Sequence, residues 1–190
     1  MKLVVAVTGA SGAPYAIRFL EQASPHCEEI FLTLSSNADA VLKTECDRTW
    51  DSVISSTSNI RLLSRKDYFT PPASGSFRHN GMVIVPCSMG TAGRIASGTS
   101  DDLTTRAADV CLKEGRKLIL VPREMPWNLI HLRNLTTLAE AGATILPASP
   151  AFYHQPKTID DLVDTVVARI LQNLGIDHQL QPQWQVTPDE

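Results

Sequence analysis

The sequence lacks the features typical of membrane-spanning, secreted and nucleic-acid-binding proteins. No apolar run approaches the ~20 residues that a helix needs to cross a bilayer, and the apolar stretch at residues 3–7 is too short for a signal peptide. There are 17 Lys and Arg against 20 Asp and Glu, so the net charge of −3 offers no basic excess for nucleic acid. We therefore expect a cytoplasmic protein that binds neither membranes nor nucleic acid.

The signatures of metal centres and of hydrolases are also absent from the sequence. The four cysteines form no C-x-x-C pair and stand at no zinc-ligand spacing, and no two histidines form H-E-x-x-H. Ser11 follows a predicted strand, but no nucleophile elbow or triad pattern accompanies it. We expect reduced thiols, no metal and no hydrolase chemistry.

Two common nucleotide-binding signatures are missing as well. The turn after the first predicted strand reads Gly9-Ala10-Ser11-Gly12, which is not G-x-G-x-x-G, and no G-x-x-x-x-G-K-[ST] occurs. The second predicted strand ends at Ser35-Ser36-Asn37, with no acid for the ribose 2′-OH of a dinucleotide. These hydroxyl groups suit a ribityl chain or a phosphate better than a dinucleotide.

Short apolar runs alternate with helical patterns along the chain, which predicts βαβ units and a parallel sheet. The expected strands cover residues 3–8, 30–34, 82–85, 118–121 and 144–146. The expected helices cover residues 14–23, 37–44, 89–96, 101–114 (capped by Asp101), 128–141 and 159–174. The prediction is an α/β fold, a three-layer αβα sandwich with a mainly parallel sheet of flavodoxin-like or Rossmann-like type. One domain would span 1–178, followed by an arm at 179–190, and residues 48–80 would be less regular, with a loop at 71–76 that could cover a site.

Two hydroxyl-rich turns follow predicted strands and open helices. The turn at residues 9–12 could cradle a phosphate with the free N–H groups of a helix start, although a plain tight turn explains its glycines equally well. The turn Ser88-Met89-Gly90-Thr91 has the same character, and Ser88 alone could be a simple helix N-cap. Because ligands of such sheets bind outside the carboxyl ends of the strands, the pair of turns favours a phosphorylated cofactor.

Several charged residues could complete such a site. Arg106, Lys113, Arg123 and Arg169 could hold a phosphate monoester at a cleft or a subunit junction, although each alone would be a solvated side chain. Glu124 is followed by the apolar residues 125–127. Its carboxyl group could be held protonated and donate a proton, or it could form a salt bridge.

Two other groups of acidic residues have simple structural interpretations, Glu45 as a surface residue and the motif at 160–164 as the start of a helix. Glu45 alone would be a surface residue at a helix end. The D-D-x-x-D pattern at 160–164 resembles a magnesium diphosphate motif, but Thr158 before it favours a helix start.

Six segments together resemble the UbiX flavin prenyltransferases, formerly named phenylacrylic or hydroxybenzoate decarboxylases. They are residues 8–13, 86–88, 105–110, 112–114, 121–124 and 152–156, and the resemblance runs from residue 1 to about 184. It implies reduced FMN and dimethylallyl phosphate as substrates, with no metal, and a prenyl group joined to flavin N5 and then C6. It also implies a homo-dodecamer with active sites at subunit junctions, and a product that becomes the cofactor of a UbiD-type decarboxylase.

The resemblance also implies roles for individual residues. Glu124 with Ser11 would pass a proton to the departing phosphate, and Glu45 would stabilise the cationic adduct or assist ring closure. The FMN contacts would be Gly9, Ala10, Ser11, Ser35, Ser88, Met89, Gly90, Thr91 and Arg123. The prenyl phosphate would be bound by Arg106, Lys113, Tyr153 and Arg169, and Trp184 would shield the site from water. Two departures from the family pattern, Ala16 after Tyr15 and Ser36 after Ser35, bear on affinity more than on chemistry.

Three other functions stay open at this point. A related flavoprotein class decarboxylates a peptidyl cysteine, but it carries an early catalytic histidine, and here none precedes His26. A non-enzymatic flavin carrier would explain the turns but not Arg106, Lys113, Arg169 and Glu124 together. An FMN-dependent enzyme that decarboxylates an aromatic acid directly would work without a partner enzyme.

Overall fold

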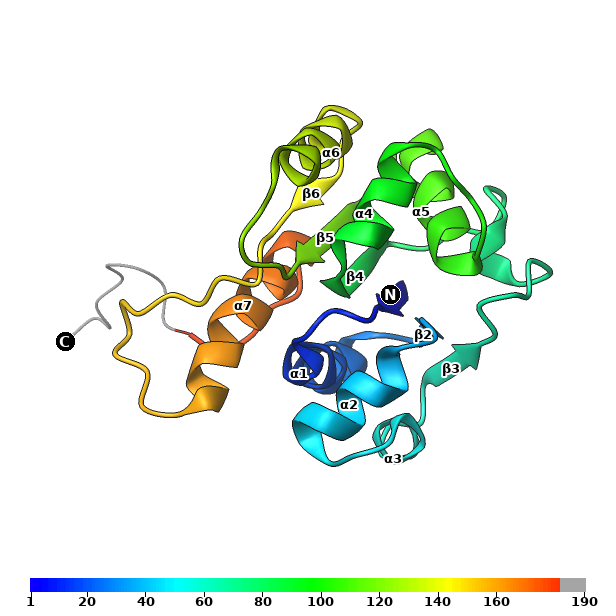
Figure 1. Ribbon diagram of the computed structural model, residues 1–190. Coiled ribbons are helices and arrows are strands. Elements are labelled where there is room, and N and C mark those ends of the chain that lie inside the picture. The colour runs from blue at the N-terminus through cyan, green and yellow to red at the C-terminus, as the bar shows by residue number, and fades with distance from the viewer. Residues whose placement is uncertain (182–190) are drawn as a thin grey trace.

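A single sheet of parallel strands forms the centre of the computed structural model, which describes residues 1–181 (Figure 1). The strands lie in the order β3-β2-β1-β4-β5-β6, and every neighbouring pair is parallel. Their bounds are β1 Lys2–Val7, β2 Glu29–Leu34, β3 Ile60–Leu63, β4 Gly81–Cys87, β5 Leu118–Pro122 and β6 Thr144–Ile145. The three-layer αβα sandwich with a parallel sheet is thereby confirmed.

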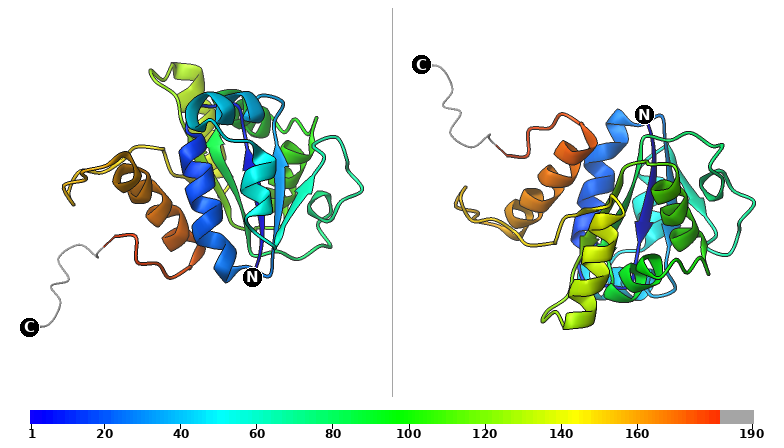
Figure 2. Two further views of the ribbon diagram at one scale, coloured as in Figure 1. Left: turned by 90° about the horizontal axis from the view of Figure 1, so that it is seen from below. Right: turned by 90° about the horizontal axis from the view of Figure 1, so that it is seen from above.

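Helices cover both faces of this sheet (Figures 1 and 2). On one face lie α1 Ala13–Ala23, α2 Ala38–Cys46, α3 Trp50–Ser55 and α7 Ile159–Leu174; on the other lie α4 Met89–Ala96, α5 Leu103–Lys113 and α6 Leu129–Glu140. Two short 3-10 turns, η1 Ser24–His26 and η2 Pro71–Ala73, complete the elements. None of the helices between residues 1 and 181 has both the length and the apolar character of a membrane span.

The strand β1 shows why the sheet is buried on both sides. Leu3, Val5 and Val7 point into the core beside α1 and α7, whereas Val4 and Ala6 point into the core beside α4 and α5. Side chains alternate along a strand, so a central strand between two helical layers must be apolar at every position.

The structure differs from the sequence-based expectation at three places. The strand β3 was not expected, because Arg61 and Leu62 at the sheet edge are exposed and break the apolar run. The helix α3 also falls in the segment expected to be irregular. Asp101 does not cap α5. Asp102 does so instead, accepting the N–H of Thr105 at 2.9 Å, while Asp101 pairs with Arg94 at 2.6 Å.

Candidate functional site at the carboxyl edge of the sheet

The order of the strands reverses between β1 and β4. The chain proceeds outward from β1 to β2 and β3, then returns to place β4 on the other side of β1. The helix after β1 covers one face of the sheet and the helix after β4 covers the other. The chain therefore turns towards opposite faces after these two neighbouring strands. Such a reversal is where ligands bind in open α/β sheets. The turns at 9–12 and 88–91 both stand at this point.

Thr8 joins these two turns. Its hydroxyl donates a hydrogen bond to the carbonyl of Pro86 at 2.8 Å and accepts one from the N–H of Ser88 at 2.7 Å. The residue is almost fully buried, so these bonds are shielded from water. Thr8 therefore fixes the start of one turn relative to the start of the other.

The helix start at Gly12 is occupied by a carboxylate of the same chain. Glu45, at the end of α2, accepts the N–H of Gly12 at 2.9 Å and that of Ala13 at 2.8 Å. Its side chain is exposed, as the sequence suggested, yet it binds across 33 residues of chain. In residues 1–181 nothing accepts from the N–H groups of Gly9, Ala10 or Ser11. A phosphate in this turn would therefore be held by these three groups and not by Gly12 or Ala13.

Two hydroxyls on β2 and just after it have no partner. The Oγ of Ser35 and the Oγ1 of Thr33 are buried without a hydrogen bond among the described residues. A buried polar atom without a partner is costly, so such atoms point to a bound ligand or water. The sequence led us to expect Ser35 at the flavin site, which stays a prediction, whereas Thr33, two residues earlier on β2, was not expected there.

At positions 9 and 12 of this edge there is no room for a side chain, so each position requires glycine. A Cβ on Gly9 would lie 2.7 Å from the Cβ of Asn37, and one on Gly12 would lie 2.9 Å from the ring of Tyr15. Gly12 also has φ +121°, a conformation that side chains disfavour. The open N–H groups, the unpartnered hydroxyls and the close backbone approach together fit a phosphorylated ligand.

The turn after β4 is ordered by its own hydroxyls. Ser88 is the N-cap of α4: its Oγ accepts the N–H of Thr91 at 3.3 Å and lies 3.0 Å from the Oγ1 of Thr91. Met89 points into the core, so only its backbone can face a ligand. Gly90 is exposed with open space where a Cβ would stand. Whether these residues contact a ligand stays a prediction.

Arg123 and Glu124 follow β5 at the same edge. The N–H of Arg123 donates to the carbonyl of Cys87 at 3.2 Å. Burial raises the pKa of Tyr15, and the guanidinium of Arg123 opposes that rise, so Arg123 lies near the start of α1. Glu124 is exposed, and so are Met125 and Trp127 after it. The apolar enclosure that the sequence suggested for Glu124 is therefore not supplied by the described residues of this chain.

The remaining cations do not meet within one chain. Arg106 and Lys113 lie on α5, whereas Arg169 lies on α7 across the sheet. Arg106 donates to the carbonyl of Ala73 at 3.0 Å, and Lys113 pairs with Glu114. Arg169 donates to Gln172 at 2.5 Å. The described residues of one protomer therefore do not bring this set into one cleft, and a meeting at a subunit junction stays a prediction.

Two residues expected to bind the prenyl phosphate or shield the site, and the acidic motif at 160–164, lie near or beyond α7 in the sequence. Tyr153 is exposed on the segment before α7, and Trp184 lies outside the described residues. Asp161 accepts the N–H groups of Lys157 and Thr158 at 2.8 and 3.0 Å, which confirms the helix-start interpretation of the acidic motif. Within residues 1–181 no three His, Cys, Asp or Glu side chains lie together as metal ligands would.

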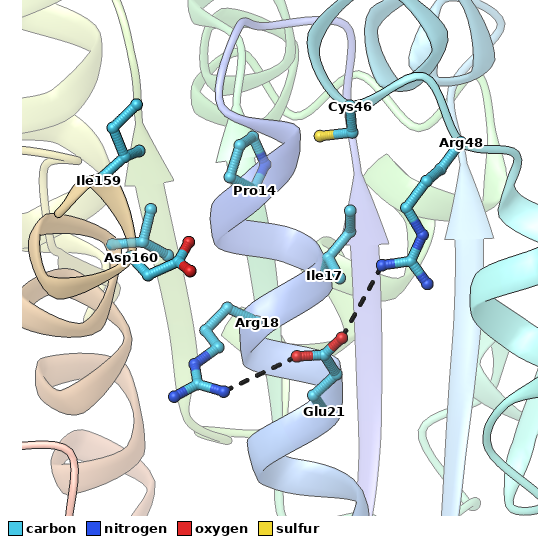
Figure 3. Close-up of a pocket in the computed structure, with 9 residues that line it drawn as sticks. Pro14, Ile17, Arg18, Glu21, Cys46, Arg48, Ile159 and Asp160 are labelled. Carbon is cyan, nitrogen blue, oxygen red and sulfur yellow. Dashed lines mark ion pairs between the residues drawn. The ribbon is translucent and has the colours of Figure 1, made fainter.

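A separate pocket of about 390 Å³ opens between α1 and α7 (Figure 3). Glu21 lies between two arginines there, 3.8 Å from Arg18 and 3.9 Å from Arg48. Cys46, next to Glu45, borders the same pocket together with Ile159. Its walls contain none of the side chains expected to bind a ligand.

Comparison with known proteins identifies close relatives over nearly the whole chain. The flavoprotein family profile matches residues 1–171. The chain is 47% identical to a flavin prenyltransferase UbiX from Thermoplasma acidophilum, covering 97% of this chain and 100% of the relative.

Two solved structures are similar at the same level. One is a crystal structure of AnUbiX (PadA1) in complex with FMN and dimethylallyl pyrophosphate, with a TM-score of 0.92, 41% identity and 98% of each chain covered. The other is a dodecameric FMN-dependent UbiX-like decarboxylase from Escherichia coli O157:H7, with a TM-score of 0.90, 42% identity, and coverage of 98% of this chain and 100% of the other.

Proposed function

We propose that this chain, which belongs to the flavoprotein family and within it to the UbiX flavin prenyltransferases, prenylates FMN at the carboxyl edge of its sheet. It is an enzyme that transfers a prenyl group, and FMN is the molecule that it modifies. The observation that carries the location is the pair of turns joined by Thr8 at the reversal of the strand order.

The residues present fit the phosphate and ribityl parts of FMN. The N–H groups of Gly9, Ala10 and Ser11 would hold the phosphate, and the hydroxyls of Ser35 and Thr33 would gain the partner that they lack. Arg123 would add positive charge at the same edge. The flavin, when bound, supplies the nucleophilic nitrogen and carbon, N5 and C6, to which the prenyl group is joined.

The donor in this proposal is dimethylallyl phosphate. Its carbon–oxygen bond breaks, and the phosphate leaves with the electron pair. Glu124 with Ser11 would supply a proton to that phosphate, and Glu45 would stabilise the cationic adduct or assist ring closure. Arg106, Lys113, Tyr153 and Arg169 would bind the phosphate across a subunit junction, because α5 and α7 lie on opposite faces of one chain.

The related structure was solved with the diphosphate, so the choice of donor needs its own support. The acidic motif at 160–164 serves the start of α7 through Asp161. A monophosphate leaving group needs cations and a proton donor, which the cationic residues and Glu124 would provide. The test supplies reduced FMN with either donor, with and without Mg²⁺, and measures released phosphate from the monophosphate or released diphosphate from the diphosphate. Release from the monophosphate without Mg²⁺ is expected; release from the diphosphate alone would contradict it.

A homo-dodecamer is the assembly that we propose for this enzyme, and its support is an exposed apolar surface. Met125 is 85% exposed, and Leu129, Ile130 and Leu132 on α6 are 59%, 66% and 47% exposed. We call these four residues the α6 patch. Proteins that stay monomeric rarely leave so many large apolar side chains in water together. A similar protein from Escherichia coli O157:H7 is dodecameric.

The product would serve as the cofactor of a UbiD-type decarboxylase, and the enzyme would act in the cytoplasm. The second point is supported by the cysteines: all four are free thiols, as a reducing compartment requires. Incubation of the purified protein with a UbiD-type decarboxylase that lacks its cofactor tests the first point. Activation that depends on both reduced FMN and the prenyl donor is expected.

Direct decarboxylation is the second candidate, because one similar protein is named an FMN-dependent decarboxylase. It predicts that the protein with FMN alone releases carbon dioxide from an aromatic acid. Absence of release in that mixture, with release after reduced FMN, the prenyl donor and a UbiD-type enzyme are added, would exclude it.

A further inference from the structure

Arg94 on α4 determines which group is the donor in each hydrogen bond that joins Arg94, Thr91 and Ser88. A guanidinium can only donate hydrogen bonds. Arg94 donates to the Oγ1 of Thr91 at 3.3 Å, and also to Asp101 at 2.6 Å and Asp102 at 3.0 Å. Its orientation is therefore set by two carboxylates, and the Oγ1 of Thr91 must be an acceptor towards it.

The hydroxyl hydrogen of Thr91 then has one available acceptor. Thr91 is almost fully buried, so its O–H needs a partner within the protein. Among residues 1–181 the acceptor within reach is the Oγ of Ser88, at 3.0 Å. Thr91 therefore donates to Ser88.

The O–H of Ser88 remains available as a hydrogen-bond donor. Its oxygen accepts from the O–H of Thr91 and from the N–H of Thr91 at 3.3 Å, which uses both lone pairs. No acceptor for the Ser88 hydrogen exists among the described residues. Ser88 is partly exposed at the turn that Thr8 joins to the turn at 9–12.

We propose that Arg94 is a positioning residue: through Thr91 it orients the Ser88 hydroxyl so that this group donates a hydrogen bond to an acceptor atom of the flavin. The inference rests on the proposed function for the identity of the ligand. It adds a residue that does not itself touch the flavin and a direction for one of its hydrogen bonds. In the same chain of bonds, burial alone would raise the pKa of Asp102. The N–H of Thr105 and Arg94 outweigh burial and lower that pKa, which keeps the anchor of Arg94 charged.

The test measures the dissociation constant of oxidised FMN by quenching of flavin fluorescence, together with the thermal midpoint of each variant. Arg94→Met and Ser88→Ala should each weaken FMN binding by roughly three- to tenfold, the effect of one lost hydrogen bond. The double variant should bind no more weakly than Ser88→Ala alone, because the two residues act through one bond. Arg94→Lys, which keeps a donor, should recover part of the affinity.

Arg18→Met is the matched control. Arg18 is also a half-buried arginine in an ion pair, at 34% side-chain exposure against 33% for Arg94, but it binds Asp164 between α1 and α7. Its loss should lower the thermal midpoint without changing FMN binding. If Arg94→Met does not fold, Thr91→Val interrupts the same chain of bonds and should weaken FMN binding equally.

Three results would separate the possible failures. If the unaltered protein does not bind FMN, the proposed function fails first. If it binds FMN and Arg94→Met changes affinity no more than Arg18→Met does, the positioning role fails alone. Independent, additive losses in the double variant would also overturn it.

Discussion

The carboxylate of Glu45 binds the backbone N–H of Gly12 at 2.9 Å, so the end of α2 fixes the start of α1. This contact joins the residue expected to stabilise the cationic adduct or assist ring closure to the turn expected to hold the flavin phosphate. A carboxylate at the positive end of a helix also stabilises that helix. Glu45 therefore has a structural role besides any chemical one, and experiments must separate the two.

Glu45→Gln should lower the free energy of unfolding by about 1 kcal/mol, because a charged cap of α1 is replaced by a neutral one. It should also slow prenyl transfer. Urea denaturation gives the first value, and the rate of product formation by folded protein gives the second. Asp47→Asn is the control: Asp47 is 90% exposed and, within residues 1–181, forms an ion pair with Lys43 alone, so its loss should cost less than ~0.5 kcal/mol. Unchanged stability in Glu45→Gln would contradict the capping role.

Glu124→Gln should reduce turnover by about a hundredfold or more, the usual effect of losing a general acid, while the dissociation constant of FMN stays as it was. Stopped-flow measurement of product formation and fluorescence titration of FMN give the two values. Glu140→Gln, an exposed glutamate at the end of α6, should change neither. Equal losses of binding and turnover would make Glu124 structural.

Leu132→Asp should dissociate the assembly, because Leu132 belongs to the α6 patch and a buried charge at an interface is costly. Leu62→Asp is the matched control: Leu62 is 46% exposed against 47% for Leu132, but it lies on β3 at the opposite edge of the sheet. Light scattering during gel filtration gives the mass of each variant. A full-size assembly of Leu132→Asp would remove the α6 patch as an interface.

The stability of the protein should fall as pH drops below about 6.5, because of His79. Burial lowers the pKa of His79, the carbonyl of Gly81 opposes this, and the charge of Arg116 adds to it. The unfolded chain, with an ordinary histidine pKa of about 6.5, then binds more protons than the folded one. Stability is therefore fully present above that value and is lost as pH falls towards the lower, folded pKa.

Urea midpoints between pH 7.5 and 5.5 check this prediction, since carboxylates titrate mostly below that range. His79→Gln should flatten the dependence on pH, whatever its effect at neutral pH. His154→Gln, at an exposed position, should leave the dependence as it is. A flat profile for the unaltered protein would contradict the account of His79.

The sequence predicted the parts of the molecule that depend on local patterns. The buried strands β1, β4 and β5 and the helices α4 and α7 are apolar or amphipathic over their length, and they appear where expected. The strand β3 was not predicted, because the side chains of an exposed edge strand need not be apolar or alternate between polar and apolar. Asp101 and Asp102 are neighbours of the same type, and only their three-dimensional partners tell which one is the cap.

The candidate site was predictable where one turn carries its chemistry and not where distant segments meet. The turns at 9–12 and 88–91 were recognisable from their glycines and hydroxyls. The contact of Glu45 with Gly12, the buried hydroxyl of Thr33 and the role of Thr8 between the turns all depend on strand order, which local patterns do not contain. The separation of Arg106 from Arg169 by the sheet has the same origin.

The most direct test of the proposed chemistry is the mass of the flavin itself. The purified protein is mixed without oxygen with reduced FMN and dimethylallyl phosphate, and the flavin is then extracted and weighed by mass spectrometry. A flavin heavier by one dimethylallyl unit, formed only when all three components are present, is the predicted result. A flavin of unchanged mass, from protein shown to bind FMN, would contradict prenyl transfer by this chain.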